Sequence, residues 1–320
     1  MAYHIHRAAA ALALPALAAL LLSGSAEART LQVGQGRQYD APSAAADAAR
    51  DGDTVSIAPG EYFDCAVWKA SNLTIQGEGR ADQVVITDKT CQGKGLFVTT
   101  GTNTTVRNLT LTRARVADGN GAGIRVEGKD LTVDGVRFVN NQNGILAGAI
   151  DGATIIVRNS EFVRNGTCEN SSGCAHGIYI GFMTRLRVEN SRFFDTREGH
   201  HIKSRASFNE IIGNDIEDGP NGTASYEIDI SNGGKVLIQG NTLQKGPKSE
   251  NRTAAIMVGS EGVLLRTPEI LIENNTFTNQ APTQTTLLTN RTATEAIVRN
   301  NRLIGDIRPL QGDGTVTPAR

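Results

Sequence analysis

The stretch Gly177-Ile-Tyr-Ile180, followed closely by Leu186-Arg-Val-Glu-Asn190, holds the pattern that decides the fold. Branched apolar residues alternate with polar ones in both runs, as they do in strands with one buried and one solvated face. Gly or Asn, which tolerate a left-handed backbone, bounds each run. The stretch therefore predicts two short strands joined and ended by tight turns.

The same pattern returns along most of the chain. Apolar runs like that of Leu186–Asn190 end at turn positions 77, 108, 134, 159, 190, 213, 240, 274 and 300. A period of roughly 20–35 residues with two or three strands per repeat is the signature of a solenoid. A leucine-rich L-x-x-L-x-L repeat is absent, and a β-sandwich would not keep one turn register. The predicted class is all-β, a single-stranded parallel β-helix.

Composition agrees with a turn-rich β protein. The 320 residues include 35 Gly but only 9 Phe, 5 Tyr and 1 Trp. The formal net charge of −1 lacks the basic excess of a nucleic-acid binder, so no nucleic-acid partner is expected. It also argues against a disordered polyanion.

The N-terminal residues predict an exported protein. An apolar run over 8–22 is too short for a comfortable membrane span and precedes the cleavage pattern Ala26-Glu27-Ala28. We therefore expect a signal peptide over 1–28, a periplasmic or secreted location, and no membrane span in the mature chain. The β-helix domain is then 29–320, with an N-terminal cap at about 29–60, coils at about 61–305 and a short tail. A short helix over 42–50 would cover the open end of the solenoid.

The even number of cysteines favours disulfides in an exported protein. Cys168 and Cys174 bracket a short polar loop, so we pair them with each other. That leaves Cys65 to pair with Cys91.

The opening Gly52-Asp-Thr-Val55 and Ala58-Pro-Gly-Glu-Tyr62, together with the Gly-Ile and Asn-turn repeats, gives the chain a family likeness. It resembles the pectate-lyase-like right-handed parallel β-helix superfamily of exported carbohydrate-active proteins over about 30–305. The resemblance implies a right-handed solenoid. It is weak for activity, because the fold hosts lyases, hydrolases, esterases, epimerases and binding proteins.

Stacking the coils predicts one polar surface. With Ile124, Ile145, Ile178, Ile202, Ile228 and Ile256 aligned inside, neighbouring positions point outward. Three consecutive coils then place six polar side chains on one patch: Tyr179, His201, Lys203, Arg205, Glu227 and Asp229. A further column holds His176, His200 and Tyr226; strict alternation turns it inward, but it lies at a strand start, so its direction stays open. The alternative to a functional patch is a ladder of charge pairs between coils.

The patch suits chemistry on a uronate, whose carboxylate must be neutralised before its α proton can be removed. Lys203 and Arg205 are candidates to neutralise it. His200, His201 or Lys203 is the candidate base, and Tyr179 the candidate acid. His176, Tyr226, Glu227 and Asp229 are candidate substrate-binding residues. We expect an acidic polysaccharide or oligosaccharide as partner and its β-elimination (a polysaccharide lyase) or C5 epimerisation as reaction.

Two alternatives stay open. A non-catalytic sugar-binding or envelope-scaffold solenoid would use the tyrosines for stacking. An inverting glycoside hydrolase would use Glu227 and Asp229 as its carboxylate pair, although the cations above them would keep both ionised. No cofactor and no metal site are expected. Ca²⁺, which several families of this fold use, finds no accompanying carboxylate cluster, and a zinc site is disfavoured because His200 and His201 are adjacent.

Overall fold

The computed structural model describes residues 1–4, 28–169 and 173–319. Most of the predicted signal peptide, residues 5–27, lies outside the described residues, so that expectation stays a prediction. Among the described residues, no helix is long and apolar enough to cross a membrane.

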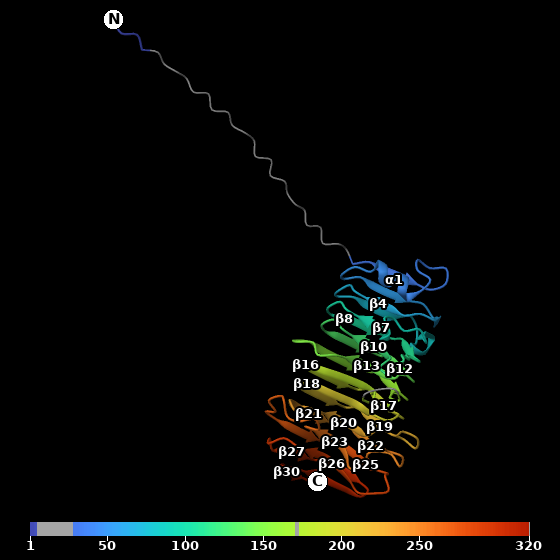
Figure 1. Ribbon diagram of the computed structural model, residues 1–320, viewed down its shortest axis with the longest axis vertical. Helices are drawn as coiled ribbons and strands as arrows, with labels where there is room; N and C mark the ends of the chain where they lie inside the picture. Colours follow the sequence, from blue (N-terminus) through green and yellow to red (C-terminus); the bar gives the residue numbers. More distant parts are fainter. Residues whose placement is uncertain (5–27, 170–172, 320) are drawn as a thin grey trace.

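The chain winds into an elongated stack of parallel coils, with the cap at the blue end and the C-terminus at the red end (Figure 1). Two parallel sheets run along the stack. In the described part of the chain, the larger sheet contains β1 (Thr30–Val33), β2 (Thr54–Ile57), β4 (Ala66–Trp68), β5 (Thr74–Gly77), β7 (Gly95–Thr99), β8 (Thr104–Arg107), β10 (Ala122–Val126), β11 (Leu131–Asp134), β13 (Asn143–Ala147), β14 (Thr154–Arg158), β16 (Ile178–Glu189), β18 (His200–Ile212), β20 (Tyr226–Ile230), β21 (Lys235–Gln239), β23 (Ala254–Val258), β24 (Ile270–Glu273), β26 (Thr285–Asn290), β27 (Ala296–Arg299), β29 (Ile307–Gln311) and β30 (Gly314–Thr317).

The second sheet faces the first across the core. It contains β3 (Gly60–Tyr62), β6 (Val84–Thr87), β9 (Thr110–Thr112), β12 (Arg137–Val139), β15 (Glu161–Val163), β17 (Arg192–Phe194), β19 (Asp215–Glu217), β22 (Thr242–Lys245), β25 (Thr276–Asn279) and β28 (Arg302–Ile304). Strand pairing continues past residue 305, where we expected a tail, because β29 and β30 pair with β26 and β27.

The core is a set of stacked identical side chains, as the repeat predicts. The isoleucine column is confirmed, since Ile124, Ile145, Ile178, Ile202, Ile228 and Ile256 are register partners from coil to coil and are fully buried. Behind it, the rings of Phe138, Phe162 and Phe193 stack face to face with centroids 4.6 and 4.5 Å apart. Each coil thus buries its apolar side chains against their equivalents in the next coil.

Buried asparagine side chains form hydrogen bonds with backbone N–H and C=O groups at the turn between the two sheets. The side chains of Asn214, Asn241, Asn275 and Asn301 form one ladder, in which each Oδ1 accepts the backbone N–H of the preceding member at 2.9 Å. Their amide groups donate to carbonyl oxygens, as Asn241 does to Ile211 at 2.8 Å. The residue before each asparagine of the ladder adopts a left-handed φ, as at Asn274 (56°) and Asn300 (55°). This explains why Asn or Gly recurs at the predicted turn positions.

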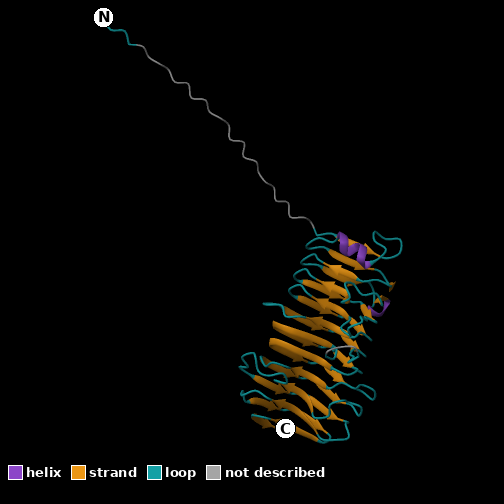
Figure 2. Cartoon of the chain, in the orientation of Figure 1, coloured by secondary structure: helices purple, strands orange, loops and turns teal. Residues whose placement is uncertain are grey.

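The helix α1 (Pro42–Ala48) lies at the N-terminal end of the stack (Figure 2) and buries Pro42, Ala45 and Ala46. It ends slightly before the expected residue 50, in the place where a cap is needed. Both predicted disulfides are present, Cys65–Cys91 and Cys168–Cys174.

Candidate functional site

The predicted outward column exists on β16, β18 and β20. Tyr179 pairs with Lys203, and Lys203 pairs with Asp229, in the register of the buried isoleucines. The ammonium of Lys203 lies 5.9 Å from the centre of the Tyr179 ring. Three successive coils therefore bring a phenol, an amine and a carboxylate together on one face.

Arg205 joins this group through a shift in register. The pairing of β16 with β18 slips between Ile180 and Phe182, so Arg205 aligns with Phe182 and not with Gly181, which an unbroken register would pair with it. A bulge of this kind re-aims the side chains beside it. The guanidinium of Arg205 lies over the Tyr179 ring, 4.9 Å from its centre, and donates a hydrogen bond to the Tyr179 hydroxyl.

Glu261, which the sequence pattern does not single out, places its carboxylate between the cationic side chains of Lys203 and Arg205. It lies in the turn after β23, and its Oε1 accepts a hydrogen bond from Lys203 Nζ at 2.6 Å. Its Oε2 accepts from Arg205 Nε at 3.1 Å. The side chain is 40% exposed. A carboxylate therefore already sits between Lys203 and Arg205 and can be displaced from the solvent side.

Asp229 lies beneath this layer and is 1% exposed. Its Oδ2 is 3.4 Å from Lys203 Nζ, and the hydroxyls of Ser231 and Ser260 donate to its two oxygens at 2.8 and 2.7 Å. Burial raises the pKa of Asp229 above its ordinary value, with Lys203 the largest opposing influence. Asp229 therefore supports Lys203 from inside and does not face the solvent.

The column of His176, His200 and Tyr226 faces the same surface, which settles the direction that the sequence leaves open. The ring centroids are 4.8 and 5.1 Å apart, and the His176 ring meets Tyr179 edge-on at 5.2 Å. Each histidine Nδ1 accepts the backbone N–H of the next member, from His200 at 2.9 Å and from Tyr226 at 3.2 Å. His176 and His200, but not Tyr226, line a cavity of about 310 Å³, whose lining also includes Gly173, Cys174, Gly199, Ser225, Glu250, Glu261, Tyr179, Lys203 and Arg205.

Both of these histidines are neutral at pH 7. Burial lowers the pKa of His176 and of His200 well below the ordinary value, and the nearby cation Lys203 lowers both further. Because each Nδ1 lone pair is already engaged, a neutral His200 keeps its proton on Nε2, which lies 3.6 Å from Asp229. These rings form an uncharged wall.

The expectation that His201 and Glu227 belong to the patch is wrong. Both are fully buried. His201 bonds Thr196 and Asp218 through its two ring nitrogens, at 2.8 and 3.0 Å, and its ring meets Phe193 edge-on. Strict alternation fails here because two consecutive residues point inward where the strand begins.

In earlier coils the position equivalent to His201 also points into the core. A Cβ on Gly123 or Gly144, the equivalents of His201, would meet the Phe138 or Phe162 ring. The glycines thus leave space for the aromatic stack, and His201 and Glu227 take that interior position in the later coils.

Glu227 is enclosed with Lys245 in the core. Lys245 Nζ lies 3.2 Å from Glu227 Oε2 and donates to the Ser225 carbonyl at 2.7 Å. Neither Glu227 oxygen has a hydrogen-bond partner among the described residues, and burial raises the pKa of Glu227 to about 8. Since Glu227 faces inward and Asp229 lies under Lys203, the carboxylate pair of an inverting hydrolase is not presented to a substrate.

This environment predicts a pH-dependent stability. An unfolded glutamate titrates near ~4.3, so above that pH the unfolded state releases a proton that folded Glu227 retains up to about 8. The free energy of unfolding of the wild type should therefore fall as pH rises from about 4.5 to 8. Glu227→Gln should flatten this slope and be the more stable protein at pH 8. Denaturant unfolding across this range, with the exposed Glu295→Gln as control, checks it; parallel profiles would contradict it.

Two family models match the chain. The one described as "Right handed beta helix region" matches residues 155–307, and the one described as "Periplasmic copper-binding protein (NosD)" matches residues 55–221, more than half of the chain. No curated protein sequence matches it.

Solved structures share the architecture at low sequence identity. An alginate lyase from Paenibacillus sp. str. FPU-7 is 18% identical with a TM-score of 0.60, covering 90% of this chain and 99% of its own. The pectate lyase Pel9A is 14% identical with a TM-score of 0.56, and the match covers 90% of this chain and 77% of Pel9A. The ORF18 protein of Geobacillus virus E2 is 14% identical with a TM-score of 0.57, and the match covers 83% of this chain and 53% of the ORF18 chain.

These likenesses establish the fold and its hand. Together with the parallel coils, the isoleucine column and the asparagine ladder, they confirm the architecture that the repeat predicts. The chain belongs to the right-handed parallel β-helix superfamily, within the family described as periplasmic copper-binding protein (NosD).

Proposed function

We propose that this protein is an exported lyase that cleaves an acidic, uronate-containing polysaccharide by β-elimination. The observation that carries the proposal is the carboxylate of Glu261 held between Lys203 and Arg205, beside the Tyr179 hydroxyl. It stands where a uronate carboxylate would be neutralised. The alginate and pectate lyases of the same fold support the substrate class, and the disulfides and predicted signal peptide support export.

The first step is neutralisation of the substrate. A uronate carboxylate displaces Glu261 and accepts hydrogen bonds from the guanidinium of Arg205, which offsets its charge, while Lys203 is released from Glu261 to act as the base. Arg205 presents a planar fork that suits a carboxylate. With its charge offset, the carboxylate can accept the electron density that develops when the proton on C5 leaves.

The second step is the elimination. Neutral Lys203 takes the C5 proton, its own proton having passed to Asp229, whose Oδ2 lies 3.4 Å away. The electron pair of the C5–H bond forms the C4=C5 double bond, and the C4–O bond breaks. Tyr179 donates its proton to the leaving oxygen, and the guanidinium of Arg205 stabilises the phenolate that remains. The proton then returns from Asp229 through Lys203 to Tyr179.

The geometry favours elimination over C5 epimerisation. An epimerase must return a proton from the opposite face of the sugar, whereas Tyr179, Lys203 and Arg205 all project from adjacent coils of one sheet. Incubating the protein with alginate and pectate and following the absorbance of the unsaturated product tests the proposal. Saturated C5-inverted product, or binding without any product, would contradict it.

Copper, named in the description of the family model, does not fit the residues described. They include no group of three or more His, Cys, Asp or Glu able to hold a metal. All four cysteines are in disulfides, and the Nδ1 atoms of His176 and His200 accept backbone hydrogen bonds. No step of the proposed reaction passes through a metal.

Glu261 competes with the substrate carboxylate for the cationic pair. Glu261→Gln keeps the shape of the side chain but removes its charge, so it should lower KM for a polyuronate about three- to tenfold, as expected from weakening one or two hydrogen bonds. We expect little change in kcat. Glu269→Gln, which removes a carboxylate paired with Lys235 at 2.8 Å outside the cavity, is the control. A higher KM in Glu261→Gln would instead make Glu261 part of the binding machinery.

A further inference from the structure

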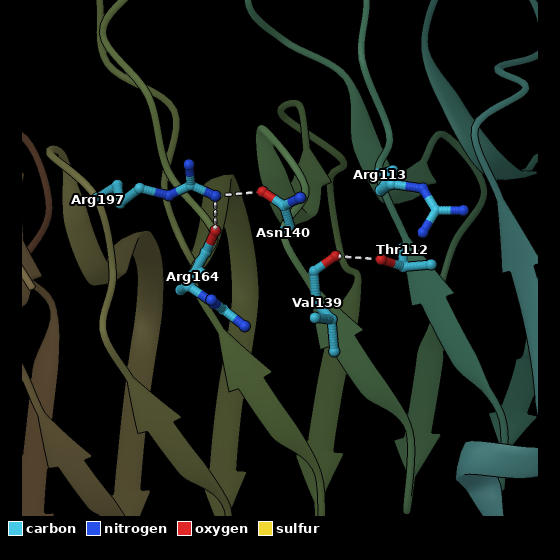
Figure 3. Close-up of a pocket in the computed structure, with 6 residues that line it drawn as sticks. All are labelled: Thr112, Arg113, Val139, Asn140, Arg164 and Arg197. Carbon is cyan, nitrogen blue, oxygen red and sulfur yellow. Dashed lines mark hydrogen bonds between the residues drawn. The ribbon is translucent and has the colours of Figure 1, made fainter.

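A second cationic cluster lies at the C-terminal ends of the strands in the smaller sheet. Thr112, Val139 and Val163 are register partners, so the residues that follow them stack in successive coils. These are Arg113, Asn140 and Arg164, all with a left-handed φ, at 62°, 56° and 54°. In the next coil Phe194 pairs with Val163, so Asp195 takes this position, with a φ of 58°. Arg197 lies two residues further on, and Figure 3 shows its guanidinium reaching back to Asn140 and to the Arg164 carbonyl.

Two guanidinium groups in this cluster, those of Arg115 and Arg197, donate only to neutral acceptors. Arg115 donates to the carbonyl oxygens of Ala114 and Asn140, at 2.9 and 2.6 Å, and to Asn140 Oδ1 at 2.9 Å. Arg197 donates to the same Asn140 Oδ1. Arg113 differs, because its Nη2 forms ion pairs with Asp88 Oδ2 at 2.7 Å and with Glu61 Oε1 at 3.2 Å. Among the described residues, no carboxylate forms an ion pair with Arg115, Arg164 or Arg197.

The charges in this cluster repel one another. Two guanidinium groups converge on one amide oxygen. Burial and then the charge of Arg197 lower the pKa of Arg115, against smaller opposing influences of the Asp88 and Glu169 carboxylates. Such crowding costs free energy that a bound anion would recover. Arg164 and Arg197 are exposed and line a cavity of about 380 Å³ with Thr112, Arg113, Val139 and Asn140.

The cluster is continuous with the rim of the proposed active-site cavity. Arg197 also lines a neighbouring cavity with Glu198 and Thr223, and the next residue, Gly199, lines the cavity of Tyr179 and Lys203. The Glu198 carboxylate on this route accepts a hydrogen bond from the backbone of Cys168. We expect a long chain seated at Tyr179 to pass over this turn and reach the arginines, and a trisaccharide to be too short to do so.

We infer that Arg115, Arg164 and Arg197 form a second, non-catalytic binding site for the carboxylates of an acidic polysaccharide. The inference rests on the proposed function for the substrate class. Guanidinium groups match carboxylates bidentately, and three of four neighbouring coils carry one here, so the cluster can bind more than one carboxylate of a linear polymer. Nucleic acid has the same repeated charge, but the net charge of −1 disfavours it.

The test compares Arg164→Ala/Arg197→Ala with Arg302→Ala/Arg308→Ala, a control that removes two exposed arginines from the last coils. Calorimetry should show that long polyuronate binds the first variant at least about tenfold more weakly than wild type, the loss expected for one charge-assisted hydrogen bond. Trisaccharide binding and kcat should not change. The effect should fade as salt is raised, since the groups are exposed.

Several outcomes would overturn the inference. They are unchanged binding of the polymer, equal weakening in the control, no polyuronate binding by the wild type, or arginine-dependent binding of DNA in its place. Arginine-dependent binding without any turnover would keep this site and reject the lyase. Turnover that depends on Lys203, together with polymer binding that does not depend on the arginines, would keep the lyase and reject this site.

Discussion

Replacing Lys203 or Arg205 by alanine is expected to lower kcat on a polyuronate by about 10²–10³, the usual cost of removing a group that stabilises developing charge. Both side chains hold the carboxylate that stands where the substrate should bind. Lys203 should show the larger loss, because it is also the proposed base. Initial rates of unsaturated product, measured with saturating substrate, check this expectation.

The two variants should differ in stability. From the sequence, both side chains point to water, which predicts a change in the free energy of unfolding of at most ~1 kcal/mol. That value still suits Arg205, whose carboxylate partner Glu261 is itself well exposed. Lys203 is only 11% exposed and contacts buried Asp229, so Lys203→Ala should cost more, about 2–3 kcal/mol.

A double variant separates folding from chemistry. Lys203→Ala/Asp229→Asn removes the uncompensated buried charge, so it should recover stability relative to Lys203→Ala while remaining inactive. Lys235→Ala, which removes an exposed lysine paired with Glu269, serves as the matched control and should retain full activity. Wild-type turnover in Lys203→Ala and Arg205→Ala would leave a ladder of charge pairs as the better account of these residues.

The fold follows from the sequence because a solenoid repeats its signal. One isoleucine column fixes the register of six coils, so the pairing of Tyr179 with Lys203 and of Lys203 with Asp229 is predicted correctly, although Asp229 is buried and not exposed as expected. The spacing of residues along the chain is therefore enough to group Tyr179, Lys203 and Asp229. This grouping needs only the register of the coils and the two-residue alternation of side chains within a strand.

The site is less predictable where periodicity fails. At the start of β18 and β20 the chain is still turning, so the alternation that places Lys203 correctly puts His201 and Glu227 on the wrong side. The bulge after Ile180 changes the partner of Arg205 in the same way. The isoleucine pattern is unaffected by either irregularity and so gives no warning of them.

Glu261 escapes prediction for a different reason. It lies in a turn after β23, outside any strand, and reaches back across coils that are more than fifty residues away in sequence. A turn residue has no register, so column alignment cannot place it. The arginines of the second cluster are hidden for the same reason, because they follow strands and adopt left-handed or irregular backbone.

Tyr179 offers the sharpest distinction between catalysis and binding. If its phenol protonates the leaving oxygen, Tyr179→Phe should lower kcat about 10²-fold, because the change removes the proton and keeps the ring. Affinity for an oligouronate should barely change, since the ring still packs against His176, whose centroid is 5.2 Å away. Parallel measurements of product formation and oligosaccharide affinity test both statements.

Tyr179→Ala supplies the other half of the comparison. It removes the ring that Arg205 covers at 4.9 Å, so it should weaken oligosaccharide binding as well as turnover, and it should free the guanidinium to move. A stacking platform without catalysis predicts the opposite pattern, with the phenylalanine variant silent and the alanine variant impaired only in affinity. The hydrogen bond from Arg205 to the hydroxyl makes the first pattern the expected one, because a cation beside the oxygen stabilises the phenolate left after proton transfer.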